Sequence, residues 1–165
     1  EMSRGLGDVY KRQQQKKQKE QRTMELMNEG LVVFDLEAAS PEETVSKIAG
    51  VMEEQGRLND RAAYVADVMK REEGAPTSIG FLIATPHAKS VHVKEPSLAF
   101  ARLKDPVQWA DEKVQMVFQI AVPDPGQGDK HLEILAKLSR KIIHDDFREQ
   151  LMNVTNEKEV LELIQ

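Results

Sequence analysis

The sequence contains no cysteine, which excludes disulfides, a thiol nucleophile and thiolate metal ligands. It also lacks any apolar run near the ~18 residues that a membrane-spanning helix needs, and its start does not resemble a signal peptide. Four histidines are present, and they show no metal-ligand spacing: His87, His92, His131 and His144. We therefore expect a cytosolic protein with no membrane insertion, no metal and no cofactor.

The first 23 residues differ in composition from the rest of the chain. Residues 3–13 look like a translated sequencing adapter, and residues 14–23 are almost entirely Gln, Lys, Glu and Arg. The Lys19-Glu20 pair can be encoded by a ribosome-binding sequence just upstream of Met24. We expect residues 1–23 to be a disordered adapter or leader artefact, and a single domain to span 24–165. The alternative is a basic, disordered arm that binds nucleic acid.

Without that segment the chain is strongly acidic. The whole sequence has 23 Lys and Arg against 28 Asp and Glu. Residues 24–165 contain 16 of the Lys and Arg and 25 of the Asp and Glu, which gives them a formal charge of −9. Such a surface disfavours nucleic acid and anionic membranes, because both carry negative charge. It favours a basic protein partner.

The order of elements after Met24 follows from periodicity and capping signals. Ser40-Pro41-Glu42-Glu43 combines an N-cap, a proline at N1 and a Glu at N3, so a helix begins there and Gly56 ends it. We expect Asn59 to cap a second helix that runs to about Glu73 and pairs with the first in antiparallel fashion. The remaining expected elements are strands at 31–36, 79–84, 98–103 and 114–122, and helices from 130, at 145–151 and at 157–164.

These elements predict an α/β fold, with one domain in which a mixed β-sheet is flanked by helices on both faces. The strand at 114–122 is apolar enough to be buried on both faces. In the helix from Lys130, capped by Asp129, we expect the apolar side chains to face inward: Leu132, Leu135, Ala136, Leu138, Ile142 and Ile143.

His87 follows the apolar run 79–84 and Pro86, at a point where the chain is expected to turn. An imidazole has a pKa near neutrality, so one ring nitrogen keeps a free lone pair and can attack phosphorus without a base. The alternative is a histidine that only caps the turn. The Pro-His pair alone does not decide between them.

Three motifs in order resemble the fructose/mannitol (type 2) class of enzyme IIA domains of the bacterial sugar phosphotransferase system. Residues 71–80 read Arg-Glu-Glu-Gly-Ala-Pro-Thr-Ser-Ile-Gly, residues 83–89 read Ile-Ala-Thr-Pro-His-Ala-Lys, and residues 129–132 read Asp-Lys-His-Leu. The resemblance covers essentially all of 24–165. It implies a phosphotransferase that forms a phosphohistidine.

The resemblance also implies partners and roles. His87 would take a phosphoryl group from the histidine-containing phosphocarrier protein and pass it to a cysteine of an enzyme IIB domain on another chain. His131 corresponds to a second active-site histidine, and Arg71 to an active-site arginine. A phosphoryl group adds about −1.5 to −2 of charge, so donors and positive charge must surround it.

Each assignment has a plainer alternative. Arg71 could make surface ion pairs with its acidic neighbours, and His131 could be a solvated residue of a first helical turn. The hydroxyls of Thr77, Ser78 and Thr85 could donate to the anion or bond within a turn. We expect no role for the other two histidines, His92 in a polar segment and His144 at a helix junction.

Two positions depart from the family pattern. Thr85 stands where an aliphatic residue is usual, and Phe81 stands where the residue is often polar or acidic. We expect the first to alter the transfer equilibrium and the second to alter the choice of partner. As alternative functions, the resemblance leaves a nitrogen-related regulatory phosphoacceptor and a purely structural interaction domain, which would not be phosphorylated.

Overall fold

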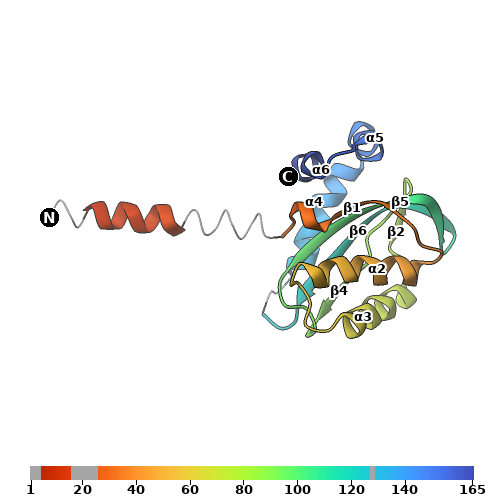
Figure 1. The fold of residues 1–165 in the computed structure, drawn as a ribbon, viewed down its shortest axis with the longest axis horizontal. Helices are drawn as coiled ribbons and strands as arrows, with labels where there is room; N and C mark the ends of the chain where they lie inside the picture. Colours follow the sequence, from red (N-terminus) through yellow and green to blue (C-terminus); the bar gives the residue numbers. More distant parts are fainter. Residues whose placement is uncertain (1–4, 16–25, 127–128) are drawn as a thin grey trace.

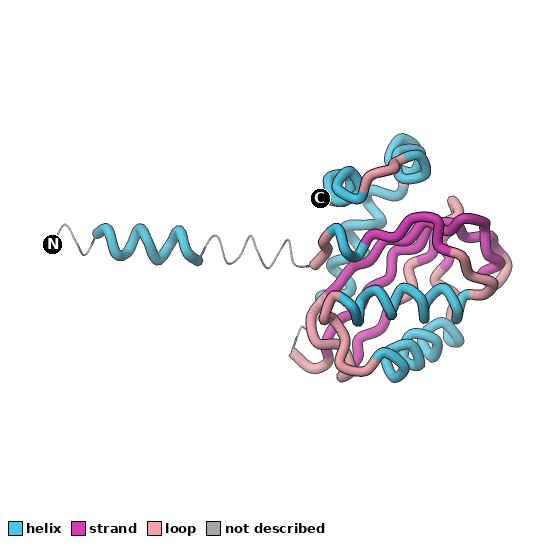
Figure 2. The backbone as a smooth tube through the Cα atoms, in the orientation of Figure 1, coloured by secondary structure: helices cyan, strands magenta, loops and turns pink. Residues whose placement is uncertain are grey.

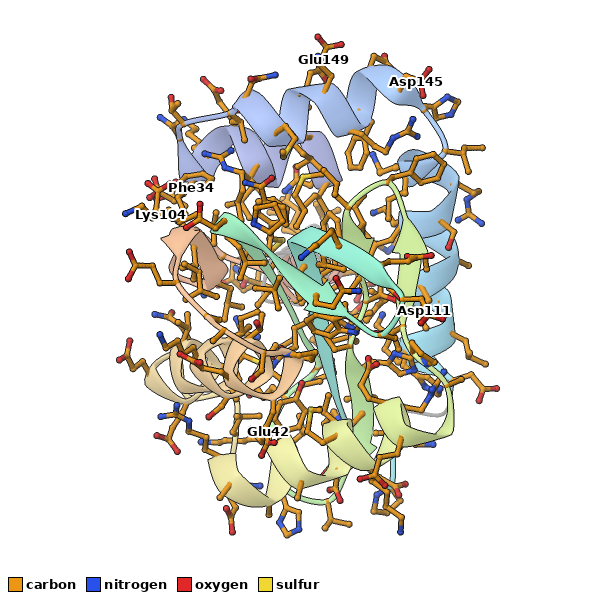
Figure 3. All side chains as sticks on the ribbon, turned by 90° about the vertical axis from the view of Figure 1, so that its right-hand side faces the viewer. Phe34, Glu42, Lys104, Asp111, Asp145 and Glu149 are labelled. Carbon is orange, nitrogen blue, oxygen red and sulfur yellow. The ribbon has the colours of Figure 1, made fainter. Side chains whose placement is uncertain are left out.

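The computed structural model describes residues 5–15, 26–126 and 129–165, and it contains one mixed sheet between two layers of helices (Figures 1 and 2). Helices α2 and α3 cover one face, and helices α4, α5 and α6 lie on the other side (Figures 1 and 3). The labelled side chains of Asp145 and Glu149, on α5, point away from the sheet (Figure 3). The α/β fold expected from the sequence is confirmed.

The sheet is built on the hairpin of β5 (Ser97–Trp109) and β6 (Glu112–Pro123), which pair antiparallel. On the outer side of β5, β1 (Val32–Leu36) runs parallel and follows a short 3-10 turn at Glu29–Leu31. The outer side of β6 is shared by two parallel strands, β3 (Ile83–Ala84) and β4 (His87–Ser90). Beyond β3 lies antiparallel β2 (Ser78–Gly80), whereas no other strand of the described residues lies outside β4.

Alternation along β6 creates two apolar cores. Val117 and Ala121 pack with the side chains of α2 and α3, whereas Phe118 and Ile120 pack with those of α4, α5 and α6. Successive side chains of a strand point to opposite faces, so a strand buried on both faces must be apolar at nearly every position. The prediction that this strand is buried on both faces is confirmed.

The first helical layer consists of α2 (Pro41–Glu54) and α3 (Arg61–Gly74), which lie side by side (Figure 1). Ser40 caps α2 as predicted, because its hydroxyl accepts from the Glu43 N–H at 3.1 Å. The prediction that Asn59 caps the next helix is wrong by one residue. Asp60 accepts from the Ala63 N–H at 3.0 Å, so α3 begins at the following residue.

The second layer consists of α4 (Lys130–Ile142), α5 (Asp145–Asn153) and α6 (Glu157–Ile164). Three inward-facing predictions for α4 are wrong, since Leu132 is 52% exposed, Ile143 is 68% exposed and Ala136 is exposed as well. The buried face instead consists of Ile134, Leu138 and Ile142, which recur at helical spacing. Among the described helices, none is long and apolar enough to cross a membrane.

The strand expected at 79–84 is in fact two strands joined by a turn. Phe81 and Leu82 have φ of 60° and 65°, so the chain reverses between β2 and β3. Pro86 then separates β3 from β4, and His87 lies in the first position of β4 rather than in a turn. β5 also extends beyond the expected 98–103, across a register shift that contains Pro106.

Residues 5–15 form a helix whose side chains are almost entirely exposed. This differs from the disorder expected for 1–23, and the other residues of that segment lie outside the described part of the chain. The interpretation of the segment as an adapter or leader stays a prediction.

Candidate active site

A cavity of about 570 Å³ opens where β4 forms the edge of the sheet. α3 contributes one wall, β4 and the residues after it a second, and the start of α4 a third. Its lining residues are Asp67, Lys70, Arg71, His87, Ala88, Lys89, Ser90, Val91, His92, Asp124 and His131. The three site residues named from the sequence, Arg71, His87 and His131, therefore meet at one cavity, although 60 positions separate the first from the last.

The backbone around His87 fixes the protonation of its ring. His87 Nδ1 lies 2.9 Å from the Thr85 carbonyl oxygen, and a carbonyl can only accept a hydrogen bond. Nδ1 therefore carries the proton of the neutral ring, which leaves the lone pair on Nε2. β4 holds this residue in place through its pairing with Ile120 on β6.

The surroundings of His87 favour the neutral ring. Burial lowers the pKa of His87 below its ordinary value, and the positive charges of Arg71 and His131 lower it further. The hydrogen bond to Thr85 and the charge of Glu72 oppose this shift without reversing it. At neutral pH the ring is therefore mostly unprotonated and nucleophilic at Nε2.

His131 stacks near His87 in the first turn of α4. The two ring centroids are 6.1 Å apart with an interplanar angle of 26°. His131 Nδ1 is buried and has no hydrogen-bond partner among the described residues. The start of α4 also directs backbone N–H groups toward the same region, which favours negative charge there.

Arg71 lies in the last turn of α3, and its guanidinium donates to the Ala75 carbonyl at 2.9 Å. Among the described residues it forms no ion pair, so the plainer reading of Arg71 as a surface ion-pair residue does not describe this structure. Its side chain is exposed at the cavity. It therefore supplies positive charge next to His87 that an anion can approach.

The threonine hydroxyls considered as anion donors are used within the fold. Thr77 Oγ1 bonds the Glu72 carboxylate, and Thr85 Oγ1 lies 3.4 Å from the Thr77 carbonyl oxygen. Both residues are buried, at 5% and 7% exposure. Both hydroxyls therefore bond within the fold, and their role as donors to an anion stays a prediction.

Several cavity residues were not identified from the sequence. Lys89 lies two positions after His87 on the same strand, so alternation places both on one face, and its Nζ is 3.9 Å from Asp124 Oδ1. Strand periodicity was the signal that would have found it. The Ser90 hydroxyl donates to Asp67 at 2.6 Å, a contact between β4 and α3 that only the tertiary structure creates.

The two histidines to which no role was assigned differ in position. His144 is at the junction between α4 and α5, as expected, where it precedes the first turn of α5. His92 lines the cavity, and the expectation that it has no role stays a prediction. Its carbonyl accepts from the Asn59 N–H at 2.8 Å, which ties the loop after β4 to the start of α3.

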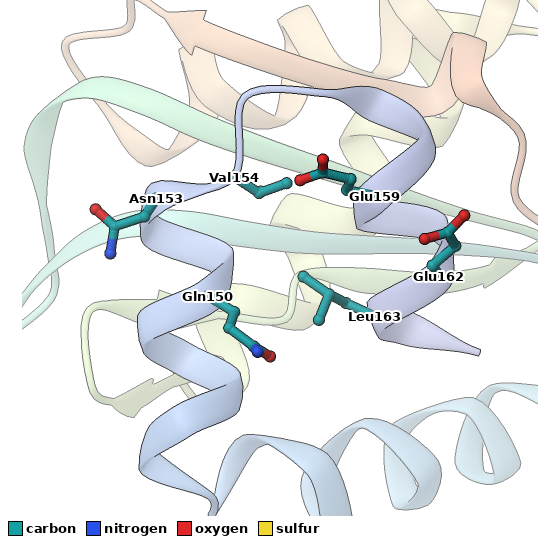
Figure 4. Close-up of a pocket in the computed structure, with 6 residues that line it drawn as sticks. All are labelled: Gln150, Asn153, Val154, Glu159, Glu162 and Leu163. Carbon is teal, nitrogen blue, oxygen red and sulfur yellow. The ribbon is translucent and has the colours of Figure 1, made fainter.

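A second cavity, of about 440 Å³, lies between α5 and α6 (Figure 4). It is lined by Gln150, Asn153, Val154, Glu159, Glu162 and Leu163, and it contains no histidine. Within the described part of the chain, no cluster of three or more His, Cys, Asp or Glu side chains could hold a metal ion.

The sequence matches a protein-family model and is similar to proteins of known name. The sequence model for "Phosphoenolpyruvate-dependent sugar phosphotransferase system, EIIA 2" matches residues 25–165. The chain is 33% identical over 137 residues to a fructose-specific EIIA component of Haloferax volcanii, covering 81% of this chain and 88% of that protein. It is also 33% identical over 143 residues to the fructose-specific EIIABC component of Bacillus subtilis; this covers 85% of the chain but only 22% of the Bacillus protein.

Solved structures share the fold. Nitrogen Regulatory Protein IIA-Ntr from Neisseria meningitidis matches with a TM-score of 0.77 and 28% identity, over 86% of this chain and 97% of that one. The mannitol enzyme IIA of Escherichia coli, in a complex with phosphorylated enzyme IIB, matches with a TM-score of 0.71 and 23% identity, over 84% and 96% of the two chains. The second match, at this identity, shows the fold alone.

Proposed function

The chain belongs to the EIIA 2 family of the phosphoenolpyruvate-dependent sugar phosphotransferase system, and within that membership we propose that His87 is the residue that carries the phosphoryl group. The family resemblance expected from the motifs is confirmed, and the protein is a phosphotransferase component of this system. The observation that supports His87 most directly is the contact of its Nδ1 with the Thr85 carbonyl, which leaves Nε2 free.

The proposed reaction needs no cofactor. Nε2 of His87 attacks the phosphorus of a phosphohistidine on the donor, the histidine-containing phosphocarrier protein. The new N–P bond forms as the donor's N–P bond breaks, and the donor ring takes back that electron pair. The proton on His87 Nδ1 stays against the Thr85 carbonyl throughout, so no general base is required.

Arg71 and His131 have electrostatic roles in this proposal. The transferred group carries negative charge on its equatorial oxygens, and positive charge or N–H donors at those oxygens stabilise the transition state. In this proposal the ring of His131, whose centroid is 6.1 Å from that of His87, donates to one oxygen. Arg71, on the α3 side of the cavity, supplies a guanidinium. Both contacts must be weak enough for the group to leave again, because it has to pass on to the acceptor.

The proposed acceptor is a cysteine of an enzyme IIB domain on another chain. The complex of a fold relative with phosphorylated enzyme IIB supports this class of partner. A thiolate attacks the phosphorus on His87, an S–P bond forms, and Nε2 leaves with its electron pair. The cytoplasmic location expected from the sequence stays a prediction.

The test is phosphorylation by the phosphorylated carrier protein, followed by detection of an acid-labile phosphohistidine. We expect labelling in the unmodified protein and in the control His144→Ala, whose histidine lies away from the cavity. His87→Ala should not be labelled, and His131→Ala should be labelled more slowly at unchanged stability. Undiminished labelling of His87→Ala would refute the assignment.

A regulatory role is the second candidate, because one solved relative is a nitrogen regulatory protein and is 28% identical to this chain. In that case His87 would still be phosphorylated, but its phosphorylation state would control another protein. Transfer to a purified enzyme IIB separates the two. Stoichiometric transfer to the IIB cysteine favours transport, and a phosphorylated protein that no IIB domain can discharge favours regulation. Genes for IIB and IIC components beside this one would also favour transport.

A further inference from the structure

We propose that Glu72 is a positioning residue for His87, acting through Thr77 and Thr85 to hold the ring with its proton on Nδ1 and its lone pair on Nε2. This inference rests on the proposed function in one respect: the Nδ1–H tautomer is needed because Nε2 is the proposed nucleophile. The geometry that supports it is a continuous series of hydrogen bonds from the Glu72 carboxylate to the imidazole.

The first contacts fix Glu72 itself. Its half-buried carboxylate accepts from the Thr77 N–H at 3.1 Å, from the Thr77 hydroxyl, and from Trp109 Nε1–H at 3.3 Å. Trp109 is only 1% exposed, so this donor is held rigidly in the core. Across the described residues, Glu72 has no Lys or Arg within ion-pair distance. Three directed donors, rather than a cation, therefore stabilise the charge of Glu72.

The next contacts connect Thr77 to Thr85. The Thr77 carbonyl accepts from the Thr85 N–H at 3.0 Å and lies 3.4 Å from the Thr85 hydroxyl. Both threonines are almost completely buried, where the loss of a hydrogen bond is costly. Moving Thr77 away from Glu72 would therefore also move the backbone of Thr85.

The last contact sets the tautomer. The Thr85 carbonyl precedes Pro86, which has no N–H and a fixed φ, so this carbonyl is held in a defined direction toward His87 Nδ1. A small rotation of the Thr85 peptide would break the 2.9 Å contact. The ring could then place its proton on Nε2, where it would block attack on phosphorus.

Glu72 also acts on His87 through its charge. The groups that face His87 are Arg71 and Glu72 from α3 and His131 from α4, and Lys70, Asp67, Lys89 and Asp124 line the same cavity. Among the groups that shift its pKa, the Glu72 carboxylate is the one whose charge raises the pKa of His87, against burial and two positive neighbours. Removing that charge should lower the pKa of His87 further.

The test compares Glu72→Gln with Glu73→Gln in full-length protein labelled with ¹⁵N in its histidine rings. Both variants remove one carboxylate, but Glu73 is exposed and its side chain forms no hydrogen bond within the described chain. We expect Glu72→Gln to raise the ratio of Nε2–H to Nδ1–H tautomer in His87 about fivefold, the effect of losing one ordinary hydrogen bond. The pKa of His87 should also fall relative to the Glu73→Gln control.

A second pair of variants tests the same contacts at Thr77. Thr77→Val removes the hydroxyl while it keeps the backbone N–H, and it should shift the tautomer ratio in the same direction. Thr77→Ser keeps a hydroxyl at this position, so its tautomer ratio should stay close to that of the unmodified protein. If Glu72→Gln does not fold, this pair of variants still tests whether the contact between Glu72 and Thr77 sets the His87 tautomer.

A tautomer ratio in Glu72→Gln equal to that of Glu73→Gln, or a Thr77→Val ratio equal to that of Thr77→Ser, would overturn the inference. The ring spectra are recorded without any phosphoryl donor. An unlabelled His87 in the phosphorylation test would refute the proposed function while these spectra still report on Glu72.

Discussion

Replacing Tyr64 by phenylalanine would remove one hydroxyl from the contact between α3 and the strand behind His87. Tyr64 is fully buried, and its hydroxyl donates to the Ile120 carbonyl at 3.0 Å. Burial raises the pKa of this phenol far above its ordinary value, so the hydroxyl remains a donor at any pH at which the protein is handled. Ile120 is also the residue that pairs with His87 across the sheet.

The structure sets the size of the effect. The phenylalanine ring fills nearly the same space, so the cavity cost is small and the lost hydrogen bond dominates, at about 1–2 kcal/mol. With an m-value of about 2 kcal/mol/M, the urea midpoint should fall by about 0.5–1 M. The Tm should fall by about 2–8 °C for a chain of this size. The rate of phosphoryl acceptance should change less than twofold, because the other contacts of His87 remain.

The single tryptophan gives the assay. Trp109 is 1% exposed, so its fluorescence reports global unfolding in urea. The matched control is Tyr10→Phe, since the other tyrosine of the chain is 62% exposed and its hydroxyl can bond water instead. Equal urea midpoints for the two variants would show that the Tyr64 contact contributes nothing. A large loss of phosphoryl acceptance in Tyr64→Phe at unchanged stability would refute the prediction that this substitution lowers stability and leaves the rate nearly unchanged.

Of four further predictions, three concern the site and one concerns a turn. Because the pKa of His87 lies below 6.5, phosphoryl acceptance should be independent of pH near 7 and fall as pH drops through that lowered value, measured as a pH–rate profile. His87 should also reduce the free energy of unfolding as pH falls from about 6.5 to its folded pKa, since the unfolded chain binds the proton more tightly there; His87→Ala should lose this dependence. Lys89→Met should lower the equilibrium level of phosphorylated protein up to about fivefold, because it removes a partly exposed positive charge from the cavity that His87 lines, and a level equal to that of Lys104→Met would contradict this. Ala110→Gly should raise the free energy of unfolding by up to about 1 kcal/mol, because Ala110 has a φ of 54° that glycine adopts without strain, and a lower urea midpoint would contradict it.

Local signals predicted those elements whose ends depend on neighbouring residues. The Ser40 cap and the proline that follows it gave the start of α2 correctly. The helix expected at 157–164 also begins where predicted, and the Asn156 side chain caps it by accepting from the Lys158 N–H at 2.8 Å. Both caps act within one turn of the chain, so the sequence alone contains the information. The apolar run of β6 was equally clear, because burial on both faces leaves no polar position to confuse the pattern.

Tertiary contacts decided the elements that the sequence did not predict. No local preference places Phe81 and Leu82 at positive φ, yet the turn forms with the Arg148 guanidinium 3.8 Å from the centre of the Phe81 ring. The extension of β5 is stabilised by pairing with β6 rather than by its own polar residues. Pro106 is accommodated there because the register shifts around it.

The residues of the candidate site could be named from the sequence, but their assembly at one cavity could not be predicted from it. The motifs named Arg71, His87 and His131 one by one, but only the packing of α3 and α4 against the edge of the sheet brings them to one cavity. The hydrogen bonds from Glu72 to His87 pass through two backbone carbonyls. Backbone groups leave no mark in a sequence, so this part of the site required coordinates.

β4 lies at an edge of the sheet, and this position exposes the protein to unwanted strand pairing. An unpaired strand edge invites another chain to add a strand, and aggregation by such pairing is the usual hazard of exposed edges. Here the edge is only four residues long and contains Lys89, and both features discourage a docking strand. A Lys89→Val variant, with a β-branched residue on that edge, would thus show whether solubility at high concentration depends on this one charge.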